Sequence, residues 1–184
     1  VMVMGGGVGG IQASLELANL GYKVYLIDSS PSVGGVMGML DKTFPTNECS
    51  MCILSPKMVE VASNINIEVI TLADVLSVEG EPGDMRVRLR IRPRYVDVDK
   101  CTGCGDCTAK CPVKIPDPYN AGLSTTRCIR VPFPQAVPGA AVIDPEVCRW
   151  LTREKCGNCV KVCQAGAVDF EQKEREETIS VGMV

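Results

Sequence analysis

Four cysteines fall within eleven residues of this chain, at Cys101, Cys104, Cys107 and Cys111, and Pro112 follows the last of them. Intervals of two, two and three residues closed by proline are typical of the cysteine runs that bind iron–sulfur clusters in bacterial ferredoxins. The glycines inside the run allow the left-handed backbone that a chain wound tightly round a cluster requires. The run therefore predicts a [4Fe–4S] cluster and, with it, electron transfer.

A second cysteine run lies further along the chain and consists of Cys148, Cys156, Cys159 and Cys163. In ferredoxins with two clusters, the fourth cysteine of one run binds the other cluster. The first predicted ligand set is Cys101, Cys104, Cys107 and Cys163, and the second is Cys111, Cys148, Cys156 and Cys159. The second run has seven residues instead of two between its first cysteines, and Gln164 stands where proline is usual. Cys148 is therefore the least typical ligand of the eight.

The first 28 residues carry the pattern of a dinucleotide-binding βαβ unit. A short apolar strand at residues 1–4 runs into a glycine-rich turn whose G-x-G-x-x-G spacing is met by Gly5, Gly7 and Gly10, with Gly9 beside the last. Residues 11–20 have helical apolar spacing, residues 23–27 form a second expected strand, and Asp28 ends it. Such a turn presents backbone N–H groups and a helix start to a pyrophosphate, and the terminal acid binds a ribose hydroxyl.

A second glycine pair, Gly34 and Gly35, follows shortly after Asp28. It is similar to the turn near the adenosine in flavoproteins with two dinucleotide domains, so FAD is the predicted cofactor. The aspartate is one methylene shorter than the glutamate usual in those flavoproteins.

Two other classes of site compete for the cysteine runs. Paired C-x-x-C motifs also form zinc ribbons, but four thiols in eleven residues ending in Cys-Pro fit a cubane cluster better. Disulfides are typical of small secreted domains. The odd number of cysteines, eleven, and the dinucleotide motif instead favour reduced thiols in the cytoplasm.

A further C-x-x-C pair, Cys49 and Cys52, precedes Ser55-Pro56, where a helix is expected to begin with proline in its first position. Thiolates are favoured at a helix N-terminus. Three interpretations stay open: a redox dithiol facing the flavin, two ligands of a third iron–sulfur cluster completed by cysteines outside this segment, or two inert thiols.

The composition excludes several function classes. The chain has no histidine, which rules out Rieske clusters, histidine-ligated haem and histidine-based catalytic triads. Its formal net charge of −3 and pI near 5.1 give no general attraction to nucleic acid. Glycines interrupt the uncharged N-terminal stretch, so no membrane span is expected.

Three smaller features complete the sequence pattern. Residues 85–94 read as a strand with five arginines on one face (Arg86, Arg88, Arg90, Arg92 and Arg94), which is more typical of a solvated antiparallel sheet than of a docking surface. Cys128 has no thiol nearby in sequence and is predicted to be structural. Trp150, the only tryptophan, is expected to pack the cysteine-rich domain.

Together these motifs resemble the A-type subunit of heterodisulfide reductase and its homologues. The resemblance rests on the two glycine segments, on Phe44-Pro45-Thr46, on the Cys49–Met58 segment, on the Cys101 run and on Pro132-Phe133-Pro134-Gln135-Ala136-Val137-Pro138. It implies an α/β, Rossmann-like FAD-binding domain of the thioredoxin-reductase type, incomplete here, with an inserted α+β ferredoxin domain that holds two [4Fe–4S] clusters. The expected boundaries are 1–94 for the FAD domain, 95–170 for the ferredoxin domain and 171–184 for the return to the FAD domain, in a segment of a longer polypeptide.

The resemblance also implies an oxidoreductase subunit that relays electrons among FAD, clusters and partner subunits, with or without electron bifurcation. Its implied partners are the other subunits of a heterodisulfide-reductase-like complex, a hydrogenase or formate dehydrogenase module, and ferredoxin. The disulfide chemistry is expected on another subunit. Two alternatives remain: an NAD(P)H-linked iron–sulfur flavoprotein of the glutamate-synthase small-subunit type, which NADPH would reduce directly, and a non-catalytic cluster- or zinc-binding module for structure or sensing.

Overall fold

The computed structural model describes residues 1–184, and the chain divides into two compact units. The first unit combines residues 1–92 with residues 174–184, and the second comprises residues 93–173. The chain thus leaves the first unit, builds the second and returns. Each unit is described separately below.

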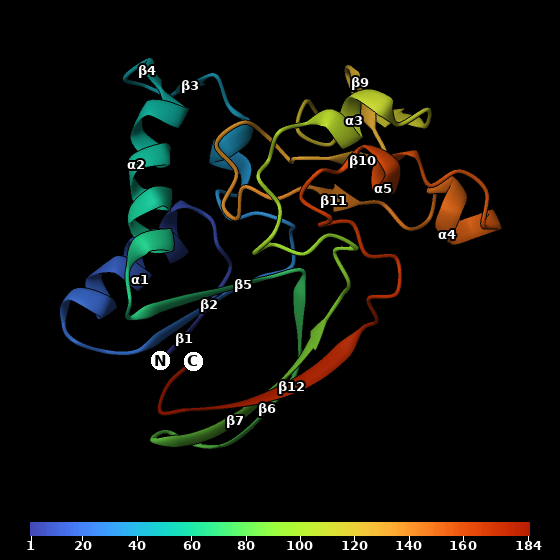
Figure 1. Ribbon diagram of the computed structural model, residues 1–184. Coiled ribbons are helices and arrows are strands. Elements are labelled where there is room, and N and C mark those ends of the chain that lie inside the picture. The colour runs from blue at the N-terminus through green and yellow to red at the C-terminus, as the bar shows by residue number, and fades with distance from the viewer. The chain divides into compact units, whose positions relative to one another are not determined.

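A three-stranded parallel sheet forms the centre of the first unit (Figure 1). Its strands are β1 (Met2–Met4), β2 (Val24–Asp28) and β5 (Ile67–Thr71), in the order β1-β2-β5. Met2 pairs with Tyr25, and Val24 pairs with Ile67. Val24 and Leu26 are fully buried, as expected of a parallel strand covered on both faces.

Two helices cover one face of this sheet, α1 (Val8–Asn19) and α2 (Ser50–Ser63). Both turn apolar residues inward at helical spacing: Ile11, Leu15 and Ala18 from α1, and Leu54, Met58 and Val61 from α2. The first helix begins three residues earlier than predicted. It ends as predicted before Gly21, whose φ of +88° suits a residue without a side chain.

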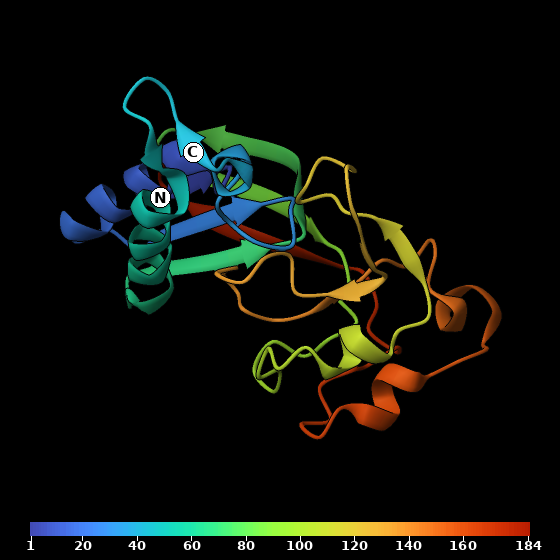
Figure 2. The same ribbon diagram turned by 90° about the horizontal axis from the view of Figure 1, so that it is seen from above.

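The other face of the parallel sheet packs against an antiparallel sheet with the order β12-β7-β6 (Figures 1 and 2). Its strands are β6 (Ala73–Glu81), β7 (Asp84–Ile91) and β12 (Arg175–Val181). Met2 and Ile27 of the parallel sheet share one buried cluster with Val87, Leu89 and Ile179. The returning segment therefore completes the core of the first unit. The predicted turn at residues 81–84 joins β6 to β7.

The arginine-rich strand is shorter than predicted, because β7 ends at Ile91 and Pro93 has no N–H with which to continue the ladder. The expectation that Arg94 shares the face of this strand is therefore wrong, and Arg94 is buried within the second unit. On β7, acids flank the arginines: Glu79 pairs with Arg86, and Asp74 bonds both Arg90 and Arg92 at 3.2 Å. This is the neutralised face of an antiparallel sheet, as the pattern favoured.

Short elements connect β2 to α2 in the first unit. They are a 3₁₀ turn at Val36–Met39 and the hairpin β3 (Lys42–Thr43) with β4 (Glu48–Cys49). Ser50 follows β4 directly, and its N–H donates to the Asp41 carbonyl at 3.2 Å. This bond holds the start of α2 against the loop after the glycine pair.

The second unit is built from short elements. Its helices are α3 (Asp106–Lys110), α4 (Arg149–Arg153) and α5 (Asn158–Val162), and its two hairpins pair β8 (Lys114–Pro116) with β9 (Thr125–Arg127) and β10 (Ile129–Arg130) with β11 (Val142–Ile143). The strand predicted at residues 167–170 is wrong in extent, since only the single bridge between Val96 and Val168 forms.

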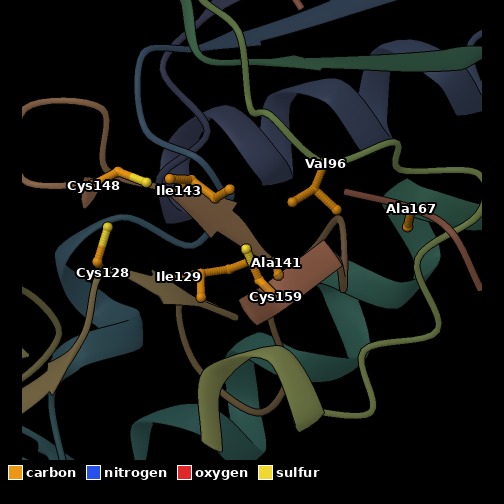
Figure 3. Packing of buried hydrophobic residues seen from close by; sticks show 8 residues of the cluster. All are labelled: Val96, Cys128, Ile129, Ala141, Ile143, Cys148, Cys159 and Ala167. Carbon is orange, nitrogen blue, oxygen red and sulfur yellow. The ribbon is translucent and has the colours of Figure 1, made fainter. Parts of the chain in front are cut away.

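The core of the second unit is unusual in its content of sulfur. Figure 3 shows its eight buried residues: Val96, Cys128, Ile129, Ala141, Ile143, Cys148, Cys159 and Ala167. The ring of Trp150 stacks on that of Phe170 with centroids 5.3 Å apart, so this tryptophan packs the cysteine-rich unit as predicted. None of the helices in the chain has the length and apolar composition that crossing a bilayer requires.

Because Leu89 is fully buried between the two sheets of the first unit, we expect Leu89→Ala to lower the free energy of unfolding by about 3 kcal/mol. The measurement is urea denaturation followed by circular dichroism. The matched control is Arg88→Ala, one residue away on the exposed face of the same strand, which should change stability by less than about 0.5 kcal/mol. Equal losses for both variants would contradict this packing.

Candidate functional site

The glycine-rich turn between β1 and α1 requires glycine at two positions. Gly5 has a φ of +95°, and its N–H donates to the Ile27 carbonyl at 2.8 Å, which fastens the turn to β2. A Cβ on Gly10 would lie 1.8 Å from the Gly5 carbonyl oxygen. No side chain fits there, so this glycine lets α1 start directly against the end of β1.

The second glycine pair packs on the first. The Gly34 N–H donates to the Gly6 carbonyl at 2.7 Å, and a Cβ on Gly35 would lie 3.0 Å from the Cα of Gly7. Gly35 also has a φ of +56°. Two segments far apart in sequence thus form one continuous backbone surface at the N-terminus of α1.

Asp28 is held beside this surface by two backbone donors. The Gly6 N–H donates to its Oδ2 and the Ser30 N–H to its Oδ1, both at 2.6 Å. At the start of α1, the capping residue Gly7 offers no side chain to the first N–H groups, and Val8 is 44% exposed. Open N–H groups, a positive helix end and a fixed carboxylate are the elements that bind a pyrophosphate and a ribose, so the residues present fit a dinucleotide.

The C-x-x-C pair lies differently from the prediction. Helix α2 begins at Ser50 with Cys49 as its capping residue, so Pro56 lies inside the helix and not in its first position. The helix starts early because the Cys52 N–H donates to the Cys49 Sγ at 3.2 Å and Ser50 is bound to the preceding loop. Both thiols are exposed and lie in the first turn.

The two thiols of this pair differ in acidity. The pKa of Cys49 is lowered, chiefly by hydrogen bonds from the side chain and backbone of Cys52. The pKa of Cys52 is raised, chiefly by the same side-chain interaction and then by desolvation. Such a split gives one thiolate and one thiol near neutral pH, the arrangement of a nucleophile beside its partner.

The first predicted ligand set lines one cavity of about 180 Å³. All four of its cysteines (Cys101, Cys104, Cys107 and Cys163) border this cavity, although Cys163 comes from the second run. Val96, Ala141 and Ala167 complete much of its apolar wall. The Ala167 N–H donates to the Cys163 Sγ at 3.3 Å, a contact that stabilises charge on this sulfur.

The second predicted ligand set lines a separate and tighter cavity of about 20 Å³. All four of its cysteines (Cys111, Cys148, Cys156 and Cys159) border it, together with Trp150 and Phe170. A fifth cysteine, Cys128, lines the same cavity. The odd total of cysteines was the only sequence signal for this fifth thiol, because no spacing motif includes it.

The two cysteine runs share a local geometry. Gly105 has a φ of +84° and precedes α3, whereas Gly157 has a φ of +79° and precedes α5. Cys111 and Cys163 occupy the same position at the C-terminal caps of these helices. Since α3 and α5 pack on each other, each capping cysteine is brought to the cavity of the other run.

Burial keeps several of these thiols protonated. It raises the pKa of Cys107, that of Cys159 to about 11 and that of Cys128 to about 12. Iron binding replaces such protons, so ligation would offset the cost of a charged sulfur in this interior. No three cysteine or carboxylate side chains in residues 1–184 gather closely enough to hold a single metal ion. The sulfurs surround cavities instead, as a larger polynuclear group requires.

A buried arginine lies near the first cavity and was not predicted to be part of a site. Arg94 is 5% exposed, and its guanidinium donates to the Ala140 carbonyl at 3.2 Å, next to the cavity-lining Ala141. Burial lowers its pKa to about 10, while Cys101 favours its charged form. The regular alternation of arginines concealed this residue, because it read as the last member of a solvated face.

Two protein-family models match the chain in agreement with this geometry. Residues 1–48 match the family described as FAD dependent oxidoreductase, and residues 94–117 match the 4Fe-4S binding domain. Three curated relatives, all A-type subunits, align with the whole chain. That of the H(2):CoB-CoM heterodisulfide,ferredoxin reductase of Methanothermobacter marburgensis is 48% identical over 183 residues, which are 27% of that protein. The iron-sulfur protein of this type from the CoB--CoM heterodisulfide reductase of Methanocaldococcus jannaschii is 48% identical over 27% of its length.

The third relative belongs to the Ferredoxin/F(420)H(2)-dependent CoB-CoM heterodisulfide reductase of Methanosarcina acetivorans and is 43% identical over 23% of its length. Over the segment that it covers, the chain belongs to the family of A-type subunits of heterodisulfide reductase. It spans about a quarter of the length of these relatives. This membership supports an FAD-binding segment joined to an iron–sulfur domain, as the sequence predicted.

The split acidity of the C-x-x-C pair predicts selective alkylation. At pH 7, we expect iodoacetamide to modify Cys49 faster than Cys52, because the lowered pKa of Cys49 leaves more of it as thiolate. The difference should shrink as the pH rises above the pKa values of both groups. Peptide mass spectrometry of Cys49→Ser and Cys52→Ser variants measures each rate separately, and a faster Cys52 would contradict the assignment.

Proposed function

We propose that this chain is the FAD- and iron–sulfur-binding segment of a heterodisulfide-reductase-like electron-transfer subunit. One observation carries the proposal: the eight thiols line two separate cavities, grouped in the crossed sets that spacing predicts. A zinc ribbon needs one compact group of four ligands and has no use for this exchange between runs. Crossed sets are the arrangement of two-cluster ferredoxins.

In this proposal, the first unit is an incomplete domain of the thioredoxin-reductase type, interrupted by a ferredoxin unit with two [4Fe–4S] clusters. The parallel order β1-β2-β5, its helical cover and the antiparallel sheet on its other face support the first part. The returning chain reaches the parallel sheet, since the Met2 N–H donates to the Met183 carbonyl at 2.8 Å. An inserted domain requires such a return to the same core.

Each group of residues has a proposed role. The glycines of both turns (Gly5, Gly7, Gly9, Gly10, Gly34 and Gly35) allow the FAD pyrophosphate to approach the backbone, and Asp28 binds the adenosine ribose. The eight thiolates hold the clusters, and the apolar walls of both cavities exclude water. When bound, the flavin supplies two-electron chemistry and the clusters one-electron chemistry, while the protein sets their position and surroundings.

The partners follow from the relatives and are part of the proposal. Their printed names combine hydrogen, formate, ferredoxin or F420H2 with the CoB-CoM heterodisulfide. We accordingly propose a cytoplasmic complex in which other subunits reduce the disulfide and a hydrogenase or formate dehydrogenase module or ferredoxin exchanges electrons with this one. Cys49 and Cys52, exposed at the start of α2, are available to a third cluster or as a redox dithiol.

The crossed ligand sets yield a direct test by anaerobic purification of the complete protein and EPR of the dithionite-reduced sample. We expect Cys163→Ala to abolish the same cluster signal as Cys101→Ala, and Cys111→Ala the same signal as Cys156→Ala, each with loss of about four irons per chain. If Cys163→Ala instead removed the signal lost in Cys156→Ala, the ligands would be uncrossed. Zinc in place of iron in the unsubstituted protein would contradict the proposed function.

The glycine surface yields a second test. Gly10→Ala should abolish FAD binding, because its Cβ would overlap the Gly5 carbonyl oxygen and push α1 away from the turn. The iron content should persist, since the cysteines belong to the other unit. Flavin absorbance and iron per chain are measured together. Asn19→Ala, exposed at the far end of the same helix, is the control and should retain FAD.

A further inference from the structure

The second cavity contains one thiol more than a cubane cluster needs. Four cysteines satisfy a [4Fe–4S] cluster, yet five border this cavity: Cys111, Cys128, Cys148, Cys156 and Cys159. Cys128 is 1% exposed, so its thiol belongs to the interior of the site. Figure 3 shows its sulfur directed from the chain toward the side on which Cys148 lies.

Cys128 and Cys148 lie on the same wall of the cavity. The Asp144 carbonyl oxygen accepts both the Cys128 thiol, at 3.3 Å, and the Cys148 N–H, at 3.2 Å. The Asp144 N–H in turn donates to the Cys128 carbonyl at 3.1 Å. One residue therefore fixes the backbones of both cysteines. Cys156 and Cys159 come from another part of the wall, beside Gly157 and α5.

Cys148 is also the least constrained of the four predicted ligands by its motif. Seven residues, including α4, separate it from Cys156, whereas two residues separate the other neighbouring thiols in the same position. Its side chain makes no capping bond at the start of α4. Its place in the ligand set thus depends on the wall that it shares with Cys128.

We propose that Cys128 is a reserve ligand of the second cluster, able to bind in place of Cys148. This inference rests on the proposed second cluster. When Cys148 is bound, Cys128 keeps its proton and donates to the Asp144 carbonyl. When Cys148 is absent, the Cys128 sulfur releases that proton to solvent and forms the Fe–S bond that Cys148 would have made. No electron is transferred, and four thiolates ligate the cluster in both states.

The test uses the complete protein, purified anaerobically with its flavin, and compares four variants by iron content and EPR. Cys148→Ala should keep the full iron content and the second-cluster signal, with shifted g values because a different thiolate is bound. Cys128→Ala should also keep both, through Cys148. The double variant should lose about four irons per chain and the second-cluster signal. Cys156→Ala, whose position has no reserve thiol beside it, should lose the same signal alone.

Each result decides the matter. Loss of the second cluster in Cys148→Ala alone, while Cys156→Ala is recovered with flavin bound, would overturn the inference and leave the proposed function intact. Retention of the cluster in the double variant would also overturn it. Absence of the second cluster from the unsubstituted protein would instead refute the proposed function. If Cys148→Ala is recovered only as insoluble protein, Cys148→Ser repeats the comparison, and its insolubility beside a soluble Cys156→Ala also counts against a reserve ligand.

Discussion

The packing of sulfur in the second unit is the constraint on which this structure depends. Three of its eight buried core residues are cysteines, and Cys101, Cys107, Cys111 and Cys163 pack around them. Its three helices have five residues each, which is too short for stability without tertiary contacts. Two cavities therefore occupy the place of a continuous apolar core. In such a unit, the free energy of ligation is also free energy of folding.

The first unit solves a different problem with the backbone instead of side chains. Its binding surface is made where two glycine segments touch, and any Cβ at Gly6 or Gly10 would meet a neighbour at 2.5 Å or less. The surface presents N–H groups and one carboxylate, with the sheets behind it supplying rigidity. A conventional apolar core, with Leu26, Leu54 and Leu89 fully buried, makes this rigidity independent of the cofactor. The two units thus relate stability to cofactor binding in opposite ways.

Burial has the same physical effect on the ionisable groups of the second unit, whatever their sign. It raises the pKa of the Cys107 and Cys159 thiols and lowers that of the Arg94 guanidinium, because the charged form loses solvation in each case. A charged cluster in this interior needs compensating groups nearby. Arg94, whose charge Cys101 favours, and the Ala167 N–H at the Cys163 sulfur are two such groups on the first cavity.

Local spacing determined much of this protein from the sequence alone. The glycine turn, the apolar period of α1 and the cysteine intervals each act over a few residues, so they predicted the βαβ unit and the two crossed ligand sets without long-range information. The odd cysteine was visible, but its site was not. Only tertiary structure brings Cys128 to the cavity of Cys148, buries Arg94 instead of leaving it on a solvated strand, and starts α2 at Ser50 despite Pro56. These three features depend on contacts between segments distant in sequence, which no local pattern encodes.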